Sequence, residues 1–308
     1  SPLVVGGNPF NTTSISSLIH YLERKWGIHF AMGGTGALVG ALEKLMVEER
    51  ITIKKNMEVT GFDFEGEKIR AVKFRNQDPI KSDTVIYNGD PGYLYHTLIS
   101  ENKQALSAKL KKSHSKLSMG LFVLYFGTTK TYPDIPHHSI WMGSRFKGLL
   151  NDIFEKKILP DDFSLYLHRP TATDKSFAPD GADSFYVLAP VPNLGGDVDW
   201  DEEGPKHRDR IVNALDNTIL PGLKEHITGE FFMTPCDFRE DYLSLDGAGF
   251  SVAPHFTQSA WFRYHNKAEG PKNLYLVGAG THPGAGLPGV VSSAKVLDHL
   301  FPNKISAV

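Results

Sequence analysis

The chain has 308 residues, of which 41% are hydrophobic and 22% charged, a composition typical of a globular protein with room for two lobes. Its formal net charge of −2 gives no support for nucleic-acid binding, which normally requires a basic face. Cys236 is the only cysteine, which excludes a disulfide within the chain and a cysteine-based metal site, and makes an intracellular, reducing compartment the default expectation.

The first fifty residues favour two amphipathic helices. The chain begins at Ser1 without an initiator methionine or a signal peptide, and we interpret this as the start of a cut chain. A first helix is predicted after Thr12, Thr13 or Ser14, each of which suits an N-cap. Its apolar stripe consists of Ile15, Leu18, Ile19, Leu22 and Trp26. A second helix follows the glycines of residues 33–36 and carries Leu38, Leu42, Leu45 and Met46. We expect the first stripe to be core, with a membrane contact as the alternative.

Residues 51–74 read as strands on either side of a turn. Val59, Phe62 and Phe64 precede the turn at residues 65–68. Ile69, Val72 and Phe74 follow it. The segment TVIYNGDPG, at residues 84–92, then ends another strand in a tight turn. These elements are compatible with packing on a nucleotide-binding sheet and, equally, with a free-standing α+β layer.

The middle of the chain, residues 96–260, is rich in aromatic strand candidates. They are MGLFVLYFG at 119–127, DFSLYLH at 162–168 and SFYVLAPV at 184–191. A helix is expected within residues 204–227, ending near Pro221. His137 and His138 are adjacent, would diverge on a strand and lack a partner at metal-ligand spacing, so no metal site is predicted. Cys236 lacks an activating pattern and is predicted to be a structural thiol.

Near the end of the chain, residues 273–295 predict a buried strand, a glycine loop and a helix. The apolar run 274–277 favours a strand that Gly278 ends, and Pro288 suits the first position of a helix. The helix is expected to bury Val290, Ala294, Leu297 and Phe301. The loop glycines are Gly278, Gly280, Gly284, Gly286 and Gly289. Such a loop lets backbone N–H groups approach a ligand, to which the helix N-terminus adds the positive end of its dipole.

The glycine loop is not the dinucleotide fingerprint of a complete βαβ unit. Pro283 stands where the sixth, small residue is needed, and too little chain follows for a second strand with its acidic residue. A surface loop without a ligand is the alternative. His282 lies within the loop, and we expect it to hold the loop or to shape the site rather than to act directly in chemistry.

Several segments, in one order from near Ser1 to about Phe301, resemble bacterial phytoene desaturases of the CrtI type. They include LVVGGNPFNTTSISSLIHYLERKWGIHF, LFVLYFG, DFSLYLHRPTATD, YVLAPVPNLG, FTQSAWFRYHN and NLYLVGAGTHPGAGLPGVVSSAK. The resemblance covers about the C-terminal three-fifths of such a protein and lacks the N-terminal dinucleotide-binding segment. The chain departs from the family pattern near Arg50 and Ile51, where the family usually has two glycines, and at Gly89, where the family usually has alanine.

The resemblance implies an α/β fold (mixed α+β): an incomplete Rossmann-like FAD-binding lobe and a mixed-sheet substrate-binding lobe, as in flavin amine oxidases. It assigns residues 1–30 to a helical segment of the substrate lobe and 31–95 to the FAD-binding lobe. It assigns residues 96–260 to the substrate lobe and 261–308 to the C-terminal part of the FAD-binding lobe.

The same resemblance implies the residues that contact FAD. Gly278, Gly280, Thr281 and His282 are expected beside the flavin ring and ribityl chain. Gly289 and Val290 are expected at the flavin carbonyl edge, where a helix N-terminus stabilises the negative charge that develops on reduction. Val59 and, more weakly, Asn88 with Gly89 are expected at the adenine end. No acid or base residue is assigned, so the catalytic residue stays unknown.

The implied activity is FAD-dependent desaturation of phytoene toward lycopene, with phytoene and partly desaturated intermediates as partners. The alternatives are a diapophytoene desaturase, a carotene isomerase or a non-catalytic lipid-binding lobe. No apolar stretch approaches the roughly 20 residues that cross a bilayer. Because the implied C40 substrate is practically confined to the bilayer, we expect the protein in the bacterial cytoplasm, bound peripherally to the inner membrane. The isolated chain is expected neither to retain FAD nor to desaturate; the oligomeric state, the number of steps and the electron acceptor are left open.

Overall fold

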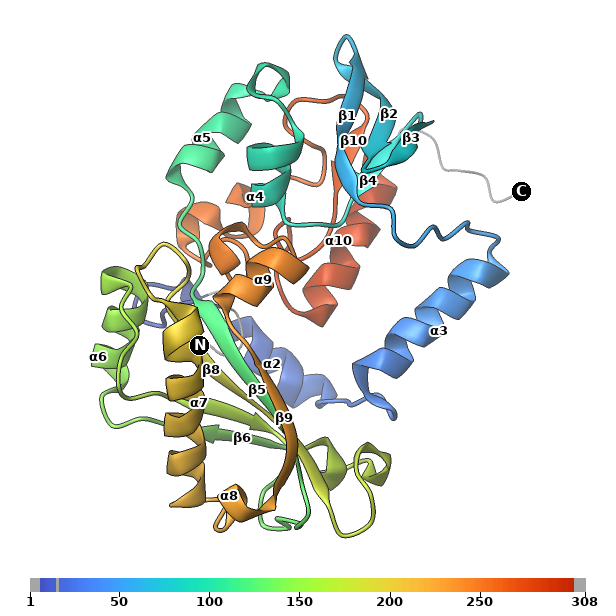
Figure 1. Ribbon diagram of the computed structural model, residues 1–308. Helices are drawn as coiled ribbons and strands as arrows, with labels where there is room; N and C mark the ends of the chain where they lie inside the picture. The colour runs from blue at the N-terminus through green and yellow to red at the C-terminus, as the bar shows by residue number, and fades with distance from the viewer. Residues whose placement is uncertain (1–5, 15–16, 302–308) are drawn as a thin grey trace. The chain divides into compact units, whose positions relative to one another are not determined.

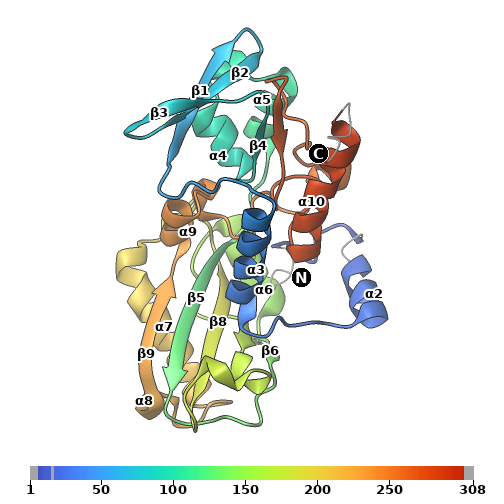
Figure 2. The same cartoon turned by 90° about the vertical axis from the view of Figure 1, so that its right-hand side faces the viewer.

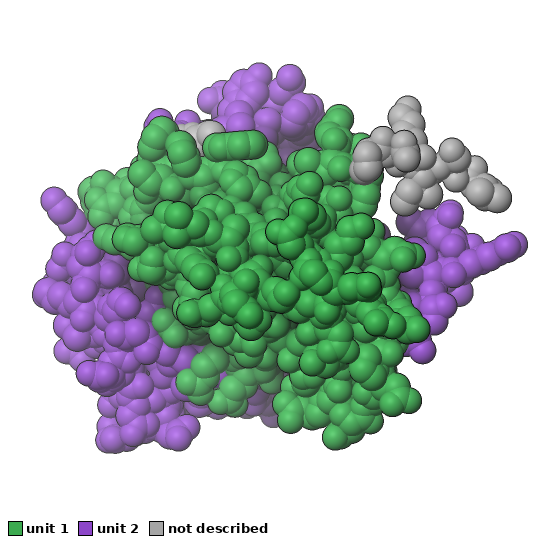
Figure 3. All heavy atoms as spheres, turned by 90° about the horizontal axis from the view of Figure 1, so that it is seen from above, with its two compact units in different colours: residues 1–13, 55–119, 237–308 green, residues 14–54, 120–236 purple. Residues whose placement is uncertain are grey.

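The computed structural model describes residues 6–14 and 17–301, in two compact units (Figures 1 and 3). The first unit comprises residues 1–13, 55–119 and 237–308, and the second comprises residues 14–54 and 120–236. Each unit is therefore assembled from segments that are far apart in the sequence. The expected segment limits at residues 30, 95 and 260 differ from these unit limits and stay a prediction.

The first unit contains two small sheets. Its strands are β1 (Val59–Glu65), β2 (Lys68–Phe74), β3 (Gln77–Lys81), β4 (Val85–Tyr87) and β10 (Leu274–Leu276). β1, β2 and β3 form an antiparallel sheet, which confirms the strands and the turn expected up to residue 74 and adds β3, which was not predicted. β4 and β10 form a separate parallel pair, in which Leu276 lies opposite Tyr87. Both of these strands were expected from the sequence.

Helices and an apolar core complete the first unit. The helices are α4 (Pro91–Tyr93), α5 (Leu106–His114), α9 (Pro235–Asp241), which lies at the sequence limit between the units, and α10 (Leu287–Leu300). The core includes Phe62, Ile69, Leu94, Tyr95, Leu274 and Leu276. α10 confirms the helix expected around Pro288 (Figure 2), but its buried residues are Ser293 and Leu297, whereas Ala294 is exposed. The buried serine is explained below by its bond to the glycine loop.

The second unit is built on a five-stranded sheet. Its strands are β5 (Gly120–Thr128), β6 (His138–Trp141), β7 (Leu165–His168), β8 (Asp183–Val191) and β9 (Ile227–Met233). They are ordered β6-β7-β8-β5-β9, and every neighbouring pair is antiparallel. The aromatic-rich strands expected within residues 119–127, 162–168 and 184–191 are thus confirmed.

One face of this sheet forms the core with α7 (Trp200–Asp216). Side chains alternate across a strand, so Phe122, Leu124 and Phe126 of β5 all point to this face. From α7 they meet Ile211, Val212 and Leu215. The helix ends at Asp216 rather than near Pro221, because the backbone turns: Leu220 N donates to Leu215 O at 2.8 Å. In addition, Leu220 directly precedes Pro221, and the helical conformation is unfavourable for a residue in that position.

The opposite face of the sheet carries at least one aromatic side chain from each strand. We call Phe231, Tyr125, Tyr186, His168 and His138 the aromatic row. Ring centroids are 4.6 Å apart between Phe231 and Tyr125, and 5.7 Å apart between Tyr125 and Tyr186. They are 4.6 Å apart between Tyr186 and His168, and 5.2 Å apart between His168 and His138. The row follows from the register, because each neighbour in it is a directly opposed pair.

The second unit also contains α2 (Ser17–Trp26), α3 (Gly34–Glu48), α6 (Phe146–Asn151) and α8 (Leu223–His226). The two predicted N-terminal helices are confirmed, but the expectation that the first stripe is core is wrong for its described part. Leu18 and Trp26 are 51% and 63% exposed, and no residue of α2 is buried; Ile15 lies outside the described residues. In the described ranges, no helix combines the length and apolar character that spanning a bilayer needs.

Candidate functional site

The parallel pair of strands brings Asn88 and Gly278 together. β4 and β10 end at the same edge, because parallel strands share the direction of their carboxyl ends. Val277 N donates to Tyr87 O at 3.0 Å, which continues the pairing up to these two residues. A Cβ on Gly278 would lie 2.7 Å from Asn88 Oδ1, and Gly278 has a φ of +105°, so both space and conformation require glycine. Ligands of α/β proteins commonly bind at this edge of a sheet.

Buried polar side chains hold the glycine loop in place. The hydroxyl of Thr281, which is fully buried, donates to Gly278 O at 2.9 Å. Gly278 N donates to Ser293 Oγ at 2.8 Å, which ties the start of the loop to α10 and explains why Ser293 is buried. Asn266 Nδ2 lies 3.2 Å from Leu276 O and 3.0 Å from His282 O, and therefore donates on both sides of the loop. The loop conformation is thus fixed by the chain itself.

Arg263 also holds the glycine loop in place through hydrogen bonds. Its guanidinium donates to Ala279 O through Nε at 3.1 Å and Nη2 at 2.8 Å, and to Val252 O through Nη1 at 3.2 Å. Burial lowers the pKa of Arg263 to about 10, and the nearby charge of Asp90 opposes this shift. Burial raises the pKa of Asp90, while the hydrogen bond from Tyr93 N opposes the rise. We assign Arg263 a positioning role, because it donates to backbone carbonyls of the loop and of its support.

Close contacts, one with a side chain and one with backbone, account for two further glycines. A Cβ on Gly280 would lie 2.3 Å from Pro91 Cδ, at the start of α4. A Cβ on Gly289 would lie 2.6 Å from Gly284 O, so the loop crosses directly over the first turn of α10. By contrast, Gly284 and Gly286 have φ values of +141° and +93°, and a Cβ on either would meet no described atom within 4 Å. These two need glycine for conformation, and the space beside them is open.

The N-terminus of α10 is available for a ligand, because the described chain does not cap it. No side chain caps the helix at Gly286 within the described residues. Val290 N already donates to Gly286 O at 2.9 Å, and Pro288 has no N–H. In the described chain, no hydrogen bond joins the N–H of Gly289 to another residue. A 14-residue helix thus presents an unpaired N–H and its positive dipole end beside an open stretch of loop.

The remaining expected site residues lie around this arrangement. His282 is half-buried within the loop; its N–H donates to Tyr264 O at 3.0 Å, and its Nδ1 is buried without a partner among the described residues. This backbone bond ties the loop to the segment that contains Tyr264. Val59 begins β1 at the margin of the first-unit core, to which Val85 and Tyr87 of β4 also belong. The flavin contacts of these residues, like those of Asn88 and Val290, stay predictions.

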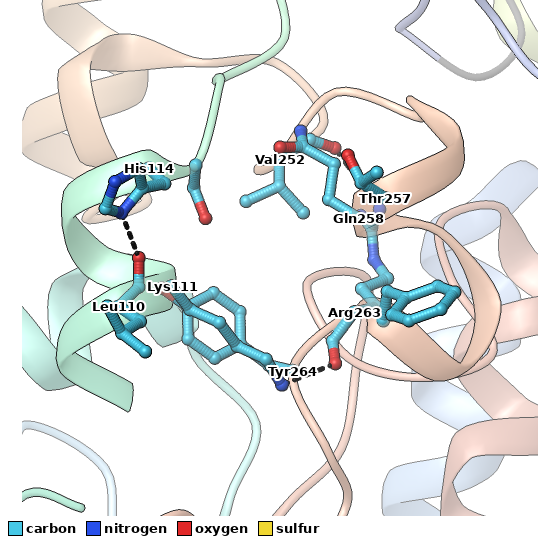
Figure 4. Close-up of a pocket in the computed structure, with 10 residues that line it drawn as sticks. Leu110, Lys111, His114, Val252, Thr257, Gln258, Arg263 and Tyr264 are labelled. Carbon is cyan, nitrogen blue, oxygen red and sulfur yellow. Dashed lines mark hydrogen bonds between the residues drawn. The ribbon is translucent and has the colours of Figure 1, made fainter. Parts of the chain in front are cut away.

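A pocket of about 270 Å³ lies in the first unit (Figure 4). Leu110, Lys111 and His114 of α5 line one side, Gln258 and Arg263 line the opposite side, and Tyr264 also contributes to the lining. Lys111 Nζ donates to Arg263 O at 3.0 Å and forms an ion pair with Glu269. Tyr264 also pairs with Thr281 as an isolated parallel bridge. The same short segment therefore lines the pocket and supports the glycine loop, which the sequence analysis did not find.

The expectation that the side chains of His137 and His138 diverge is wrong, because their ring centroids lie 4.4 Å apart. His168 of β7 lies opposite His138 of β6, and one possible ligand nitrogen from each of the three histidines lies within 4.8 Å of the others. The partner comes from a neighbouring strand, so the sequence spacing of ligands does not reveal it.

Comparison with known proteins relates the chain to flavin enzymes. Residues 4–296 match the profile described as flavin containing amine oxidoreductase. The chain is 46% identical to a phytoene desaturase (lycopene-forming) of Pantoea ananas, over 95% of this chain and 60% of that protein. It is 42% identical to a phytoene desaturase (neurosporene-forming) of Rhodobacter capsulatus, over 98% and 59% respectively. The chain thus spans about 60% of the length of the curated relatives that it matches.

Solved structures support the same architecture. An oxidoreductase from Methanosarcina mazei superposes with a TM-score of 0.59 and 15% identity, over 87% of this chain and 55% of that chain. A putrescine oxidase superposes with a TM-score of 0.52 and 8% identity, over 86% and 53% respectively. At such identities the likeness concerns the fold, which is mixed α/β and flavin amine-oxidase-like.

Proposed function

The chain belongs to the flavin containing amine oxidoreductase family, and from this premise we propose that the protein uses FAD to desaturate phytoene toward lycopene. One structural observation carries the proposal: the uncapped N-terminus of α10, the glycine loop and the carboxyl ends of β4 and β10 converge within the first unit. The choice of substrate rests on the relatives named above as phytoene desaturases, at 42% to 46% identity.

The residues at the loop fit a flavin. Gly289 offers an unpaired N–H, and the positions of Gly284 and Gly286 leave open space that side chains would fill. In the proposed complex, Gly278, Gly280, Thr281, His282, Gly289 and Val290 line the flavin end of FAD, and Asn88 and Val59 lie toward its adenine end. Bound FAD supplies the acceptor for a hydride removed from an allylic carbon.

The N-terminus of α10 stabilises negative charge that arises beside it, through its dipole and the N–H of Gly289. Arg263, Asn266 and Ser293 keep the loop from moving when that charge develops, because each is hydrogen-bonded to the loop or to its flanks. Such fixed dipoles need no rearrangement during the reaction.

The aromatic row supports a conjugated hydrocarbon as the substrate. Rings at Phe231, Tyr125 and Tyr186 give one face of the five-stranded sheet a continuous aromatic surface. A polyene offers no hydrogen-bonding groups, so its recognition depends on apolar area and ring contact. We assign this face to contact with the chain of the substrate.

A peripheral position on the inner membrane, facing the bacterial cytoplasm, is part of the proposal. A C40 hydrocarbon is practically confined to the bilayer, so the enzyme must take it up at the membrane surface. Exposed apolar side chains on α2 and α3 support such a contact. They include Leu18, Tyr21, Trp26, Val39, Leu42 and Leu45. Lys25 lies 5.1 Å from the ring centre of Trp26, which combines a cation with an aromatic side chain as interfacial helices do.

Pigment analysis tests the proposed activity. The complete gene is expressed in bacteria that accumulate phytoene, and in a parallel strain that accumulates the C30 analogue diapophytoene. We expect lycopene in the first strain and little conversion in the second. Conversion of the C30 precursor alone would favour the diapophytoene desaturase alternative, for which a 32% identical relative is known. Unchanged phytoene in cells that contain folded, flavin-loaded protein would contradict the proposal.

A further inference from the structure

Three histidines converge at one edge of the second-unit sheet. His138 and His168 are directly opposed on β6 and β7, and opposed residues project to the same face. His137 precedes β6 by one residue, so strand alternation does not force its side chain to the other face. Ring centroids are 4.4 Å apart for His137 and His138, 4.6 Å for His137 and His168, and 5.2 Å for His138 and His168. We call these residues the histidine cluster.

One ring nitrogen of each histidine is already bonded to a hydroxyl. His137 Nδ1 lies 2.5 Å from Thr173 Oγ1, and His138 Nδ1 lies 2.6 Å from the hydroxyl of Tyr166. His168 Nδ1 lies 3.2 Å from the same Tyr166 hydroxyl. Nε2 of each histidine takes no part in these hydroxyl bonds, and an outer hydrogen bond to the other nitrogen is typical of metal-binding histidines.

A second observation points to a ligand. His137 Nε2 is buried and has no hydrogen-bond partner among the described residues. Buried polar atoms are normally paired, so an unpaired ring nitrogen within reach of two other imidazoles calls for an explanation. A cation bound by the cluster would satisfy it.

The surroundings hold the rings and keep them neutral. Phe30 contacts His137 edge to face at 4.5 Å, and Tyr186 stacks on His168 at 4.6 Å. Burial lowers the pKa of all three histidines, for His168 to about 4, and their mutual repulsion adds to the shift for His137 and His168. Neutral imidazoles have the lone pair that a metal ion requires.

From this geometry we propose that His137, His138 and His168 bind one divalent cation of the zinc class (Zn²⁺, Co²⁺ or Ni²⁺). Imidazole nitrogen suits these ions, whereas Mg²⁺ and Ca²⁺ prefer oxygen ligands. Three protein ligands leave one position of a tetrahedral site open to water. Zn–N bonds of about 2.0 to 2.1 Å place tetrahedral ligand atoms roughly 3.3 Å apart, so the rings move slightly inward on binding. The site lies within the second unit and does not depend on the proposed flavin chemistry.

Calorimetric titration with Zn²⁺ tests the proposal on chelator-treated protein expressed from its complete gene. We expect one ion per chain for the wild type and no comparable binding of Mg²⁺. His168→Gln keeps a polar side chain of similar size and is expected to weaken binding at least about a hundredfold. Tyr166→Phe removes the outer hydroxyl and is expected to weaken it by about 10- to 100-fold. His20→Ala is the control, because His20 is an exposed histidine on α2, 72% exposed at its side chain.

Two further readouts separate a bound ion from general effects. Co²⁺ should give the visible absorption of a four-coordinate nitrogen site in the wild type and in His20→Ala, and not in His168→Gln. Zn²⁺ at a hundred times its Kd should raise the Tm of the wild type by roughly 2 to 4 °C, and should leave the Tm of His168→Gln unchanged. Equal Zn²⁺ affinity in the wild type and His168→Gln, or no binding in the wild type, would overturn the proposal.

Discussion

Substitution of Gly289 perturbs the contact between the glycine loop and α10 most directly. In Gly289→Ala the new Cβ would lie 2.6 Å from Gly284 O, a backbone atom, so the loop must shift. Overpacking of this kind costs about 1 to 3 kcal/mol. Alanine regains up to about 1 kcal/mol through its better helix propensity. The net loss of unfolding free energy is therefore expected to be small, about 0 to 2 kcal/mol.

This change is also expected to weaken FAD binding. Displacement of the loop separates the N–H of Gly289 and the helix dipole from the flavin, and a hydrogen bond to an uncharged flavin oxygen contributes about 0.5 to 1.5 kcal/mol. This corresponds to roughly 2- to 13-fold weaker binding. Gly289→Asp adds a negative charge that favours the apo helix N-terminus by about 0.3 to 1 kcal/mol but repels the electron-rich edge of the flavin. The Gly289→Asp variant should thus bind FAD more weakly than the Gly289→Ala variant does. Without FAD, its Tm should be no lower than that of Gly289→Ala.

Flavin fluorescence titration and thermal melting measure the two effects separately. The control is Gly40→Ala, because Gly40 lies within α3 and a Cβ there meets no described atom within 4 Å. That variant should keep wild-type FAD affinity and gain about 0.5 to 1 kcal/mol of stability. If Gly289→Ala and Gly289→Asp both bind FAD as tightly as the wild type does, the assignment of the α10 N-terminus to the flavin is refuted.

Three further predictions follow from other parts of the chain. Arg263→Met leaves the carbonyl of Ala279 without its donor and should lower the unfolding free energy by roughly 1 to 3 kcal/mol, seen as a lower urea midpoint; an unchanged midpoint would argue against the positioning role. Burial lowers the pKa of His207 to about 3, so His207 stays neutral in the folded protein while the unfolded chain protonates below about 6.5. The unfolding free energy should therefore decrease as the pH is lowered from about 6.5 toward 3, by up to about 1.4 kcal/mol per pH unit. His207→Leu should reduce this slope between pH 7 and pH 5. Equal slopes in the variant and the wild type would exclude His207 as the source of the pH dependence. Trp26→Glu should reduce flotation of the protein with anionic liposomes, whereas equal flotation would show that α2 is not a membrane contact.

Local sequence pattern predicted most elements of the fold. The runs around Phe62, Val123 and Leu274 are apolar and β-favouring, and turn residues bound them, so each strand could be located without its partner. Pattern alone could not predict that β4 pairs with β10, because these strands are far apart in the sequence and no local signal encodes a parallel register across that distance. The neighbourhood of Asn88 and Gly278 depends on that pairing.

The supporting residues of the site were missed for a different reason. Arg263 and Asn266 lie on irregular backbone, where no periodicity marks a buried side chain. The available signal was the presence of Arg263 and Asn266 within the aromatic segment WFRYHN, because such polar side chains are costly to bury unless they are hydrogen-bonded. The histidine cluster likewise depends on cross-strand register. Helical spacing correctly predicted α2, but spacing cannot say what covers an apolar stripe, and in the described chain Leu18 and Trp26 of this stripe are exposed.

Anaerobic mixing of the flavin-loaded protein with phytoene in liposomes tests the central claim most directly. The protein is expressed from its complete gene, and the visible absorption of oxidised flavin is followed while the carotenoids are extracted and identified. We predict that the absorption falls as more desaturated products appear, and that Gly289→Asp slows both together. Persistent oxidised flavin with full recovery of phytoene would contradict the account.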